Sequence, residues 1–183
     1  MNRPKIALLV VAFALAAPLG LAQATSVDRY CLGKPEQQFL RLINDYRASK
    51  GLGKLTAGQR IGAAAQHHSV DMARRDYFDH TTLGTGAGPK ARLIDHGYPA
   101  DRTGWGENIY AGYGDGDSDG LQAQTAREAF DGWKHSPGHN ANMLNANFTA
   151  IGIDRAYDAD ATYKYYWTTD FGGAIDRQPA ALC

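Results

Sequence analysis

Three side chains with acid–base and metal-binding chemistry stand out, although they lie far apart in the sequence. His80 ends the segment Tyr77–His80, Glu107 lies within Trp105–Ile109, and His139 follows a Ser-Pro-Gly turn. Two imidazoles and one carboxylate can hold Zn²⁺ and leave its fourth position for water or a ligand. No HExxH motif is present and the spacings are too long for a metal motif, so a hydrogen-bonded polar cluster without metal is the alternative interpretation.

Asn108, Ser136 and His135 lie next to these residues in the sequence and are further candidates for the same cleft. Ser136 is close to His139, which raises the possibility of a nucleophilic serine. However, Ser136 is followed by proline in a turn, and the chain lacks the GxSxG sequence of a nucleophile elbow. We therefore predict no catalytic residue here, and an enzyme is the less favoured interpretation.

Aromatic residues gather in sequence around the polar candidates, and a cleft with aromatic walls and few polar anchors suits a small apolar ligand. The residues concerned are Tyr77, Phe78, Trp105, Tyr110, Tyr113 and Trp133. Core packing is the alternative, and we favour it for Phe78 and Trp133.

Hydrophobic spacing predicts three helices, and later β-branched and aromatic residues predict two strands. The predicted elements are helices over 35–49, from Thr56 past Met72, and over 125–133, then strands over 151–153 and 163–171. Thr56 with Gln59, and Thr125 with Glu128, have capping-box spacing. His68 shares a helical face with apolar residues and is predicted to be a core histidine, whereas His96 is predicted at a helix end.

The N-terminal segment has the pattern of a secretory signal peptide. Arg3 and Lys5 precede the apolar run 6–17, and a small-residue cleavage pattern ends at Ala24. The run is shorter than the ~20 residues that a membrane-spanning helix needs. We expect residues 1–24 to be removed, leaving one domain over 25–183 with its core at about 36–173, outside the cytoplasm and without a transmembrane anchor.

Two cysteines, Cys31 and Cys183, are the only ones in the chain. In an oxidising compartment a disulfide between them is the expected state. Such a bond closes almost the whole expected domain into one loop, and by chain entropy it would stabilise the fold by about 4 to 5 kcal/mol.

The composition excludes one class of partner. The 183 residues are 44% hydrophobic, and 19 Lys+Arg balance 19 Asp+Glu. This is enough apolar material for one core, without the basic excess of a nucleic-acid-binding protein. Asp115, Asp117 and Asp119 match the first half of a calcium loop, but position 12 is Ala126, so only weak Ca²⁺ binding is conceivable and a flexible acidic loop is favoured.

The motifs around His80, Glu107 and His139 resemble those of the CAP superfamily of cysteine-rich secretory proteins, antigen 5 and pathogenesis-related proteins. The likeness also includes the run Ala64–Ala73 and the run Tyr166–Gly172, in the family's order, over about 39–172. It implies an α+β fold, a three-layer α-β-α sandwich with a central, mostly antiparallel sheet. It also implies an open cleft that holds two His and two Glu.

Carried over to this chain, the resemblance assigns His80, Glu107 and His139 to that cleft. The second Glu of the family pattern falls at Ser136, so one carboxylate is missing. Three functions are compatible with these observations. The favoured one is a secreted module that binds a small apolar or amphipathic ligand such as a lipid or sterol, with or without a divalent metal. The others are a zinc-dependent hydrolase acting on an envelope or host substrate and a non-catalytic interaction protein.

Overall fold

The computed structural model describes residues 30–113 and 119–183. The signal-peptide segment and two of the three aspartates of the half calcium loop, Asp115 and Asp117, lie outside the described residues. In chain order the elements are β1 (Cys31–Leu32), α1 (Lys34–Ser49), β2 (Thr56–Ala57), α2 (Gln59–Arg75), α3 (Pro89–Asp95), β3 (Trp105–Gly112), α4 (Asp119–Lys134), α5 (Pro137–Met143), β4 (Ala150–Tyr157), β5 (Tyr165–Gly172) and β6 (Ala181–Leu182).

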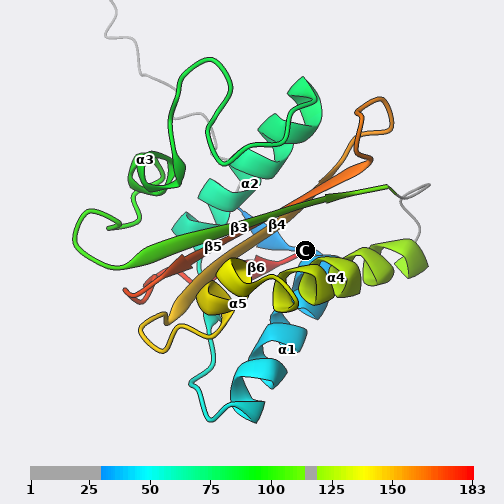
Figure 1. Ribbon diagram of the computed structural model, residues 1–183. Helices are drawn as coiled ribbons and strands as arrows, with labels where there is room; N and C mark the ends of the chain where they lie inside the picture. The colour runs from blue at the N-terminus through cyan, green and yellow to red at the C-terminus, as the bar shows by residue number, and fades with distance from the viewer. Residues whose placement is uncertain (1–29, 114–118) are drawn as a thin grey trace, which may run out of the picture.

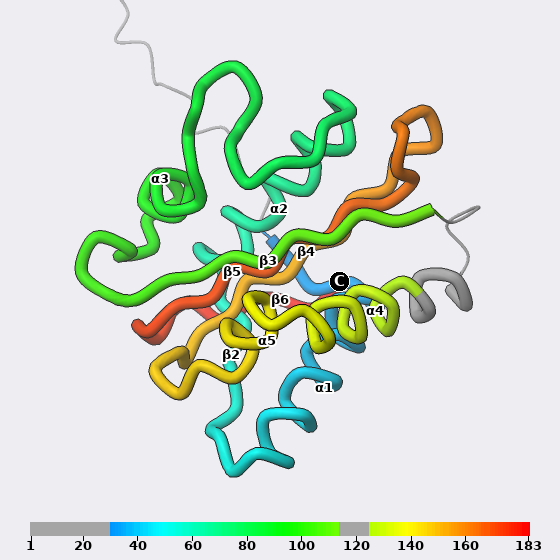
Figure 2. The backbone as a smooth tube through the Cα atoms, in the orientation of Figure 1, coloured from blue at the N-terminus to red at the C-terminus, as the bar shows by residue number. Residues whose placement is uncertain are grey.

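These elements form three layers around a four-stranded sheet. Its strand order is β2-β4-β5-β3, with β2 parallel to β4 and both other pairs antiparallel. Helices α2 and α3 cover one face, and α1, α4 and α5 cover the other (Figures 1 and 2). The α-β-α sandwich and the mostly antiparallel sheet are therefore confirmed.

The face beneath α1 and α4 holds the largest apolar core. Phe39 of α1 packs edge-on against Trp133 of α4, with ring centroids 5.2 Å apart, and lies beside Trp167 of β5. Ile151 and Ile153 of β4 point to the same face and are fully buried. Because successive side chains of a strand point to opposite faces, the residues between these in β4 point to the other face, beneath α2.

The face beneath α2 is closer packed and more polar. At Gly152 of β4, an added Cβ would lie 2.1 Å from the backbone oxygen of Ile61, so only glycine allows this approach of helix and strand. On the same face, the hydroxyl of Ser69 donates to the buried carboxylate of Asp154. Backbone contact and buried polar groups thus coexist on one side of the sheet.

The two ends of the described chain are joined. Strands β1 and β6 pair in parallel, and a disulfide links Cys31 to Cys183, whose Cα atoms lie 5.4 Å apart. The predicted disulfide is thereby present in the structure. A sequence separation of 152 residues makes this a long loop, for which chain entropy gives a stabilisation of about 4 to 5 kcal/mol.

Both capping-box predictions are wrong, for two different reasons. Thr56 belongs to β2, and α2 begins after Gly58, where the carboxylate of Asp176 accepts from the backbone N–H groups of Arg60 and Ile61. Asp176, which is distant in the sequence, thus caps the N-terminus of α2 in place of the predicted Thr56. Thr125 lies inside α4, which begins six residues earlier at Asp119.

Six elements were not predicted: the two-residue strands β1, β2 and β6, the short helices α3 and α5, and the edge strand β3. His96 is the C-cap residue of α3, so its predicted place at a helix end is confirmed. Within the described residues, no helix is both long and apolar enough to cross a membrane.

Candidate functional site

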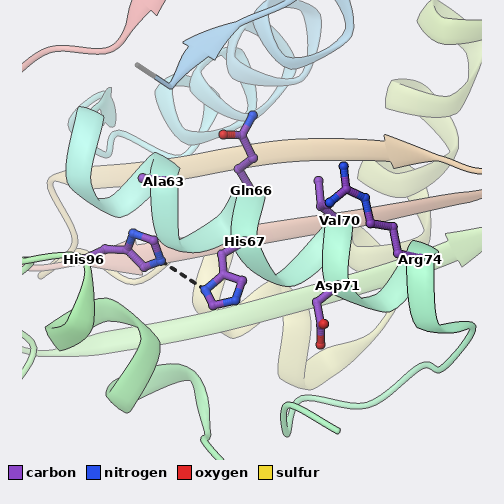
Figure 3. Close-up of a pocket in the computed structure, with 7 residues that line it drawn as sticks. All are labelled: Ala63, Gln66, His67, Val70, Asp71, Arg74 and His96. Carbon is purple, nitrogen blue, oxygen red and sulfur yellow. Dashed lines mark hydrogen bonds between the residues drawn. The ribbon is translucent and has the colours of Figure 1, made fainter. Parts of the chain in front are cut away.

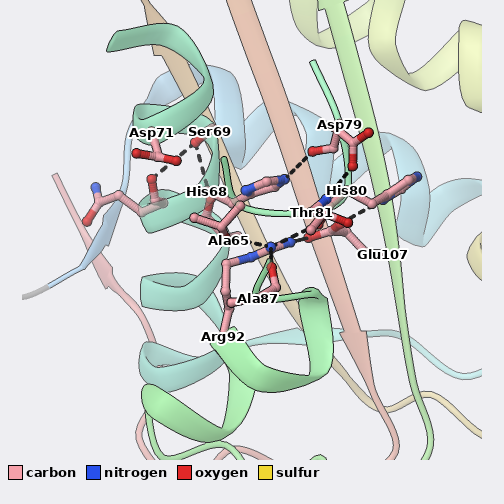
Figure 4. Close-up of polar contacts among 12 residues, drawn as sticks. Ala65, His68, Ser69, Asp71, Asp79, His80, Thr81, Ala87, Arg92 and Glu107 are labelled. Atoms are coloured by element: carbon pink, nitrogen blue, oxygen red, sulfur yellow. Dashed lines mark hydrogen bonds and ion pairs between the residues drawn. The ribbon is translucent and has the colours of Figure 1, made fainter. Parts of the chain in front are cut away.

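The site begins with a histidine held by a buried carboxylate. His80 lies in the loop after α2 and leaves 49% of its side chain exposed, whereas Glu107 of β3 is buried. The Nδ1 atom of His80 lies 2.7 Å from Oε1 of Glu107 (Figure 4). The carboxylate therefore fixes the orientation of a ring whose other edge faces outward.

The second oxygen of Glu107 is held by Arg92, a residue that the sequence did not single out. Arg92 projects from α3, is almost fully buried, and places Nη2 2.5 Å from Oε2 of Glu107. Its Nη1 donates to the backbone oxygens of His80 and Ala87 and to the hydroxyl of Thr82. One arginine thus neutralises the carboxylate and fastens the His80 loop to α3.

Two further buried ionisable groups lie behind this pair. Asp170 of β5 is the cross-strand neighbour of Glu107 and is fully buried, and burial followed by the negative charge of Glu107 raises its pKa well above the usual range. The Nε2–H of His68 of α2 donates a hydrogen bond to the backbone oxygen of Asp79, and burial lowers the pKa of His68 to about 4. At neutral pH His68 is therefore uncharged, and the carboxylate of Glu107 is paired with the guanidinium of Arg92.

The prediction for His68 is confirmed: it is a core histidine with one bonded nitrogen. Its Nδ1 has no hydrogen-bond partner among the described residues. Asp79 does not replace the missing carboxylate of the cleft. Its Oδ1 instead accepts from the backbone N–H of Thr81, and that hydrogen bond lowers the pKa of Asp79.

His139 approaches the site from α5, on the other side of β3. Its Nδ1 lies 2.9 Å from the hydroxyl of Ser136, the N-cap residue of α5. Asn108 of β3 donates to the backbone oxygen of His139, which joins the helix to the edge strand. Asn142, one turn later, donates to Oδ1 of Asn108 and to the backbone oxygen of Glu107.

The two candidate imidazoles differ in their tendency to bind a proton. The hydrogen bond to Glu107 raises the pKa of His80 above its ordinary value, with burial opposing. Burial and the nearby positive charge of His80 lower the pKa of His139. The charge of His80 thus acts on the ring of His139, although the two side chains come from opposite sides of β3.

A pocket of about 330 Å³ lies beside His139, along the edge strand. Most of its lining is apolar or aromatic, and Ser136 and His139 supply the polar side chains. The lining residues are Phe78, Ile109, Tyr110, Ala111, Gly132, Trp133, Ser136, His139 and Tyr163.

The aromatic prediction is correct in part. Phe78, Tyr110 and Trp133 line the pocket; Trp133 is a core residue as expected, but Phe78 is not, because 44% of it is exposed. Tyr163 was missed, since in sequence it reads only as part of a strand. Tyr77 and Trp105 lie outside this lining.

A family model described as the cysteine-rich secretory protein family, CAP, matches residues 40–171. The match extends over more than half of the chain. The chain belongs to the CAP family. The family is also that of the resemblance noted in the sequence, and the fold agrees with it.

Two proteins of Bacillus subtilis are similar to this chain in sequence. The chain is similar to an uncharacterized membrane protein of Bacillus subtilis, YlbC, at 36% identity over 67% of this chain and 32% of that protein. The B. subtilis protein YkwD is 30% identical over 75% of this chain and 47% of its own length. The chain thus spans less than half the length of both relatives.

A solved structure supports the same family. An extracellular protein from Bacillus anthracis that contains an SCP domain superposes with a TM-score of 0.53 at 31% identity, over 74% of this chain and 39% of that one. At this identity the likeness concerns sequence as well as fold.

In this CAP protein, Ser136 stands where the family resemblance implies a second Glu. The structure places its hydroxyl on Nδ1 of His139. The serine therefore orients one imidazole much as Glu107 orients the other, but without a negative charge. No carboxylate accompanies the Ser136–His139 pair among these contacts, so a Ser-His-acid triad is not formed.

The remaining candidates lie away from the pocket. His135 is exposed at the end of α4, and its Nδ1 contacts the backbone oxygen of Asp131. Asp119 is the first residue of α4, and its side chain is outside the described part of the structure. The structure brings together His80, Glu107, Asn108, Ser136 and His139, and leaves His135 outside.

Proposed function

We propose that this CAP-domain protein is secreted and binds a small apolar or amphipathic ligand in the pocket along β3. The observation that carries the proposal is the lining itself: aromatic and aliphatic side chains form the walls, and Ser136 and His139 form one polar end. A volume of about 330 Å³ lies at the lower end of the range of ~300 to 1,000 Å³ typical of small-molecule sites.

The charged groups support an amphipathic ligand over an ionic one. Glu107 and Arg92 neutralise each other behind the strand and are both buried. The pocket itself therefore presents an uncharged hydroxyl and a histidine whose pKa is lowered. An acyl or ring system with one hydrogen-bonding group matches this chemistry.

The secreted location rests on the N-terminal pattern and on the disulfide. Disulfides persist in oxidising compartments and are rare in the cytosol, and the structure joins Cys31 to Cys183. The test is recovery of the processed chain, beginning at residue 25, from the medium or periplasm of the producing cell.

Ligand binding is tested by extracting purified protein with organic solvent and identifying co-purified lipids by mass spectrometry. Fluorescent fatty-acid and sterol probes then give affinities. Phe78→Ala removes a pocket wall and should weaken probe binding by about tenfold, because a fully used aromatic contact contributes ~1.5 kcal/mol or more.

Trp105→Ala is the matched control. Trp105 is an aromatic of similar exposure, 39% against 44% for Phe78, but it does not line the pocket. Probe binding that is equally weakened in both variants, or unchanged in both, would overturn the proposal. If neither variant loses probe binding and both still capture the same protein partners in pull-downs, the non-catalytic interaction protein is favoured.

A second candidate function uses zinc. Each imidazole has its Nδ1 held, His80 by Glu107 and His139 by Ser136, an arrangement typical of histidines that bind metal through Nε2. Glu107 has both oxygens engaged, so it fits as a supporting group more than as a ligand. Consistently, the described residues contain no group of three His, Cys, Asp or Glu side chains with metal-binding geometry.

When bound, zinc would supply a Lewis acid and a water of lowered pKa, which is the chemistry of a hydrolase. The residues of this chain would hold the ion through His80 and His139 and keep both rings oriented. Zinc affinity measured by calorimetry should fall as pH drops through ~6.5, since the imidazoles must be neutral. Unchanged affinity in His80→Ala would remove this site, and turnover insensitive to chelators would remove the hydrolase.

A further inference from the structure

A second pair of histidines lies on the outer side of α2, away from the cleft. His67 projects from the exposed side of α2, and His96 projects from the C-cap of α3 toward it (Figure 3). Their rings meet, with Nδ1 of His67 3.1 Å from Nε2 of His96. This places two imidazole nitrogens from separate helices in direct contact at the surface.

The pair lies in an open hollow of about 550 Å³, which shares no lining residue with the pocket along β3. Asp71 lies one helical turn beyond His67 and also lines this hollow. Its carboxylate accepts from the hydroxyl of Tyr77 at 2.6 Å and contacts Arg75. The hollow therefore has space for an ion with bound water beside the two rings.

The spacing of the two nitrogens is close to that required by one metal ion. With Zn–N bonds of ~2.0 to 2.1 Å and tetrahedral angles, two imidazole nitrogens on the same ion lie ~3.3 Å apart. The observed separation is 3.1 Å. Rotation of the rings is needed to direct both lone pairs to one point, and the His67 side chain that must turn is exposed.

Burial and the neighbouring His67 lower the pKa of His96, which favours its neutral form. A neutral imidazole is the form that binds metal. The hydrogen bond between the rings already uses one nitrogen lone pair and one N–H. For both rings to bind one ion, the ring that donates must carry its proton on its other nitrogen, so that each ring offers one lone pair at the contact.

We propose that His67 and His96 form a second divalent-cation site that links α2 to α3. Two imidazoles select borderline ions such as Zn²⁺ and Ni²⁺ over the oxygen-seeking Mg²⁺ and Ca²⁺. The carboxylate of Asp71 is paired with Arg75 and the hollow is also lined by Arg74, so the two imidazoles are the protein ligands and water completes the coordination. The site is independent of the ligand pocket and of the zinc site proposed at His80 and His139.

An ion at this position bears on the cleft through α3. Arg92 lies one turn before His96 on the same helix and holds both Glu107 and the His80 loop. Joining the end of α3 to α2 restricts the helix that carries Arg92. Ion binding should therefore slow amide hydrogen exchange in α3.

The test uses the disulfide-bonded chain carrying His80→Ala and His139→Ala, which removes the other candidate site. Calorimetric titration with Zn²⁺ and with Ni²⁺ should show one bound ion, and Mg²⁺ should show none. Adding His67→Gln or His96→Gln should weaken binding by about tenfold or more, because one imidazole alone cannot chelate. His135→Gln, which removes another exposed histidine, is the matched control and should leave binding unchanged.

A second measurement does not depend on the His80→Ala and His139→Ala background. It uses His67→Gln, His96→Gln and His135→Gln, each made in the otherwise unchanged chain. There, His67→Gln and His96→Gln should abolish the zinc-dependent slowing of exchange in α3. Absence of binding in the background, equal loss in His135→Gln, or full binding after His67→Gln would each overturn the site. None of these results bears on lipid binding in the β3 pocket.

Discussion

The two faces of the central sheet bury their side chains in different ways. Beneath α1 and α4, aromatic and aliphatic residues such as Phe39, Trp133 and Ile151 form the largest apolar cluster, although α1 also carries the buried Glu36 and Arg47. Beneath α2 and α3, Glu107, Arg92 and other ionisable groups are equally buried. Both faces exclude water, but the second also buries the ion pair of Arg92 with Glu107.

The face beneath α1 and α4 thus supports the fold, whereas the face beneath α2 and α3 positions the candidate site. The apolar face obtains its stability from area removed from water, which tolerates small changes of shape. The polar face holds His80 in place through a chain of paired charges, and removing one partner leaves a buried charge alone. The polar face should therefore be the more sensitive to substitution and to pH.

The largest effect is expected from Arg92→Met. The exchange leaves the buried carboxylate of Glu107 without its cation, and breaking such a pair costs about 3 to 5 kcal/mol. Urea unfolding measures the loss. The double variant Arg92→Met with Glu107→Gln should recover part of it, whereas Arg102→Met, at an exposed pair with Asp101, should unfold close to wild type. A single variant as stable as wild type would contradict the comparison of the two faces.

A pH effect is expected from His68. Its folded pKa of about 4 lies below the ordinary 6.5, so the unfolded chain binds more protons between these values. Stability contributed by neutral His68 is present above pH 6.5 and is lost as pH falls toward 4, by roughly 3 kcal/mol. His68→Gln should remove this contribution.

The measurement is the difference between the two unfolding profiles, since other groups act in the opposite direction. Burial raises the pKa of Glu36 to about 7 and that of Asp154 to about 6. Both contribute stability that is lost as pH rises, and both are present in wild type and variant alike. Parallel profiles for wild type and His68→Gln would show that His68 does not titrate as described.

Gly152→Ala tests the close approach of α2 to the sheet. The new Cβ would lie 2.1 Å from the backbone oxygen of Ile61, so helix and strand must separate. Overpacking of this kind costs about 1 to 3 kcal/mol. Gly138→Ala is the control because nothing lies within 4 Å of its added Cβ. Thermal unfolding of both variants provides the comparison, and equal melting temperatures would argue against the tight contact.

The smallest effect is expected on the apolar face. Ile151→Val removes one buried methyl group and should lower the free energy of unfolding by about 0.5 to 1.5 kcal/mol. The loss should be the same at pH 5 and pH 8, because no titratable group is altered. A pH-dependent loss would show that the two faces are coupled.

Sequence patterns predicted the long elements of the fold. Helices α1 and α2 and strands β4 and β5 follow clear periodicities, and two cysteines leave one pairing. The short helices α3 and α5 have seven residues each, too few to repeat a hydrophobic spacing. Strand β3 was missed because its Trp-Gly-Glu-Asn-Ile sequence mixes polar and apolar residues without alternation.

Only those residues of the candidate site that lie in recognisable sequence motifs could be predicted. His80, Glu107 and His139 were identified, the family assignment was correct, and their proximity agrees with it. Arg92 was not identified because its role depends on the place of α3, which no local pattern gives.

The contacts of Asn142 and Trp133 have a consequence for association between molecules. The first donates to the backbone oxygen of Glu107 and the second to that of Ile109, 2.9 Å away. These carbonyls belong to the outermost strand, where an incoming peptide would otherwise pair. Two side chains thus terminate the hydrogen-bond ladder, and the sheet cannot extend from this side into a dimer or a fibril without first displacing them.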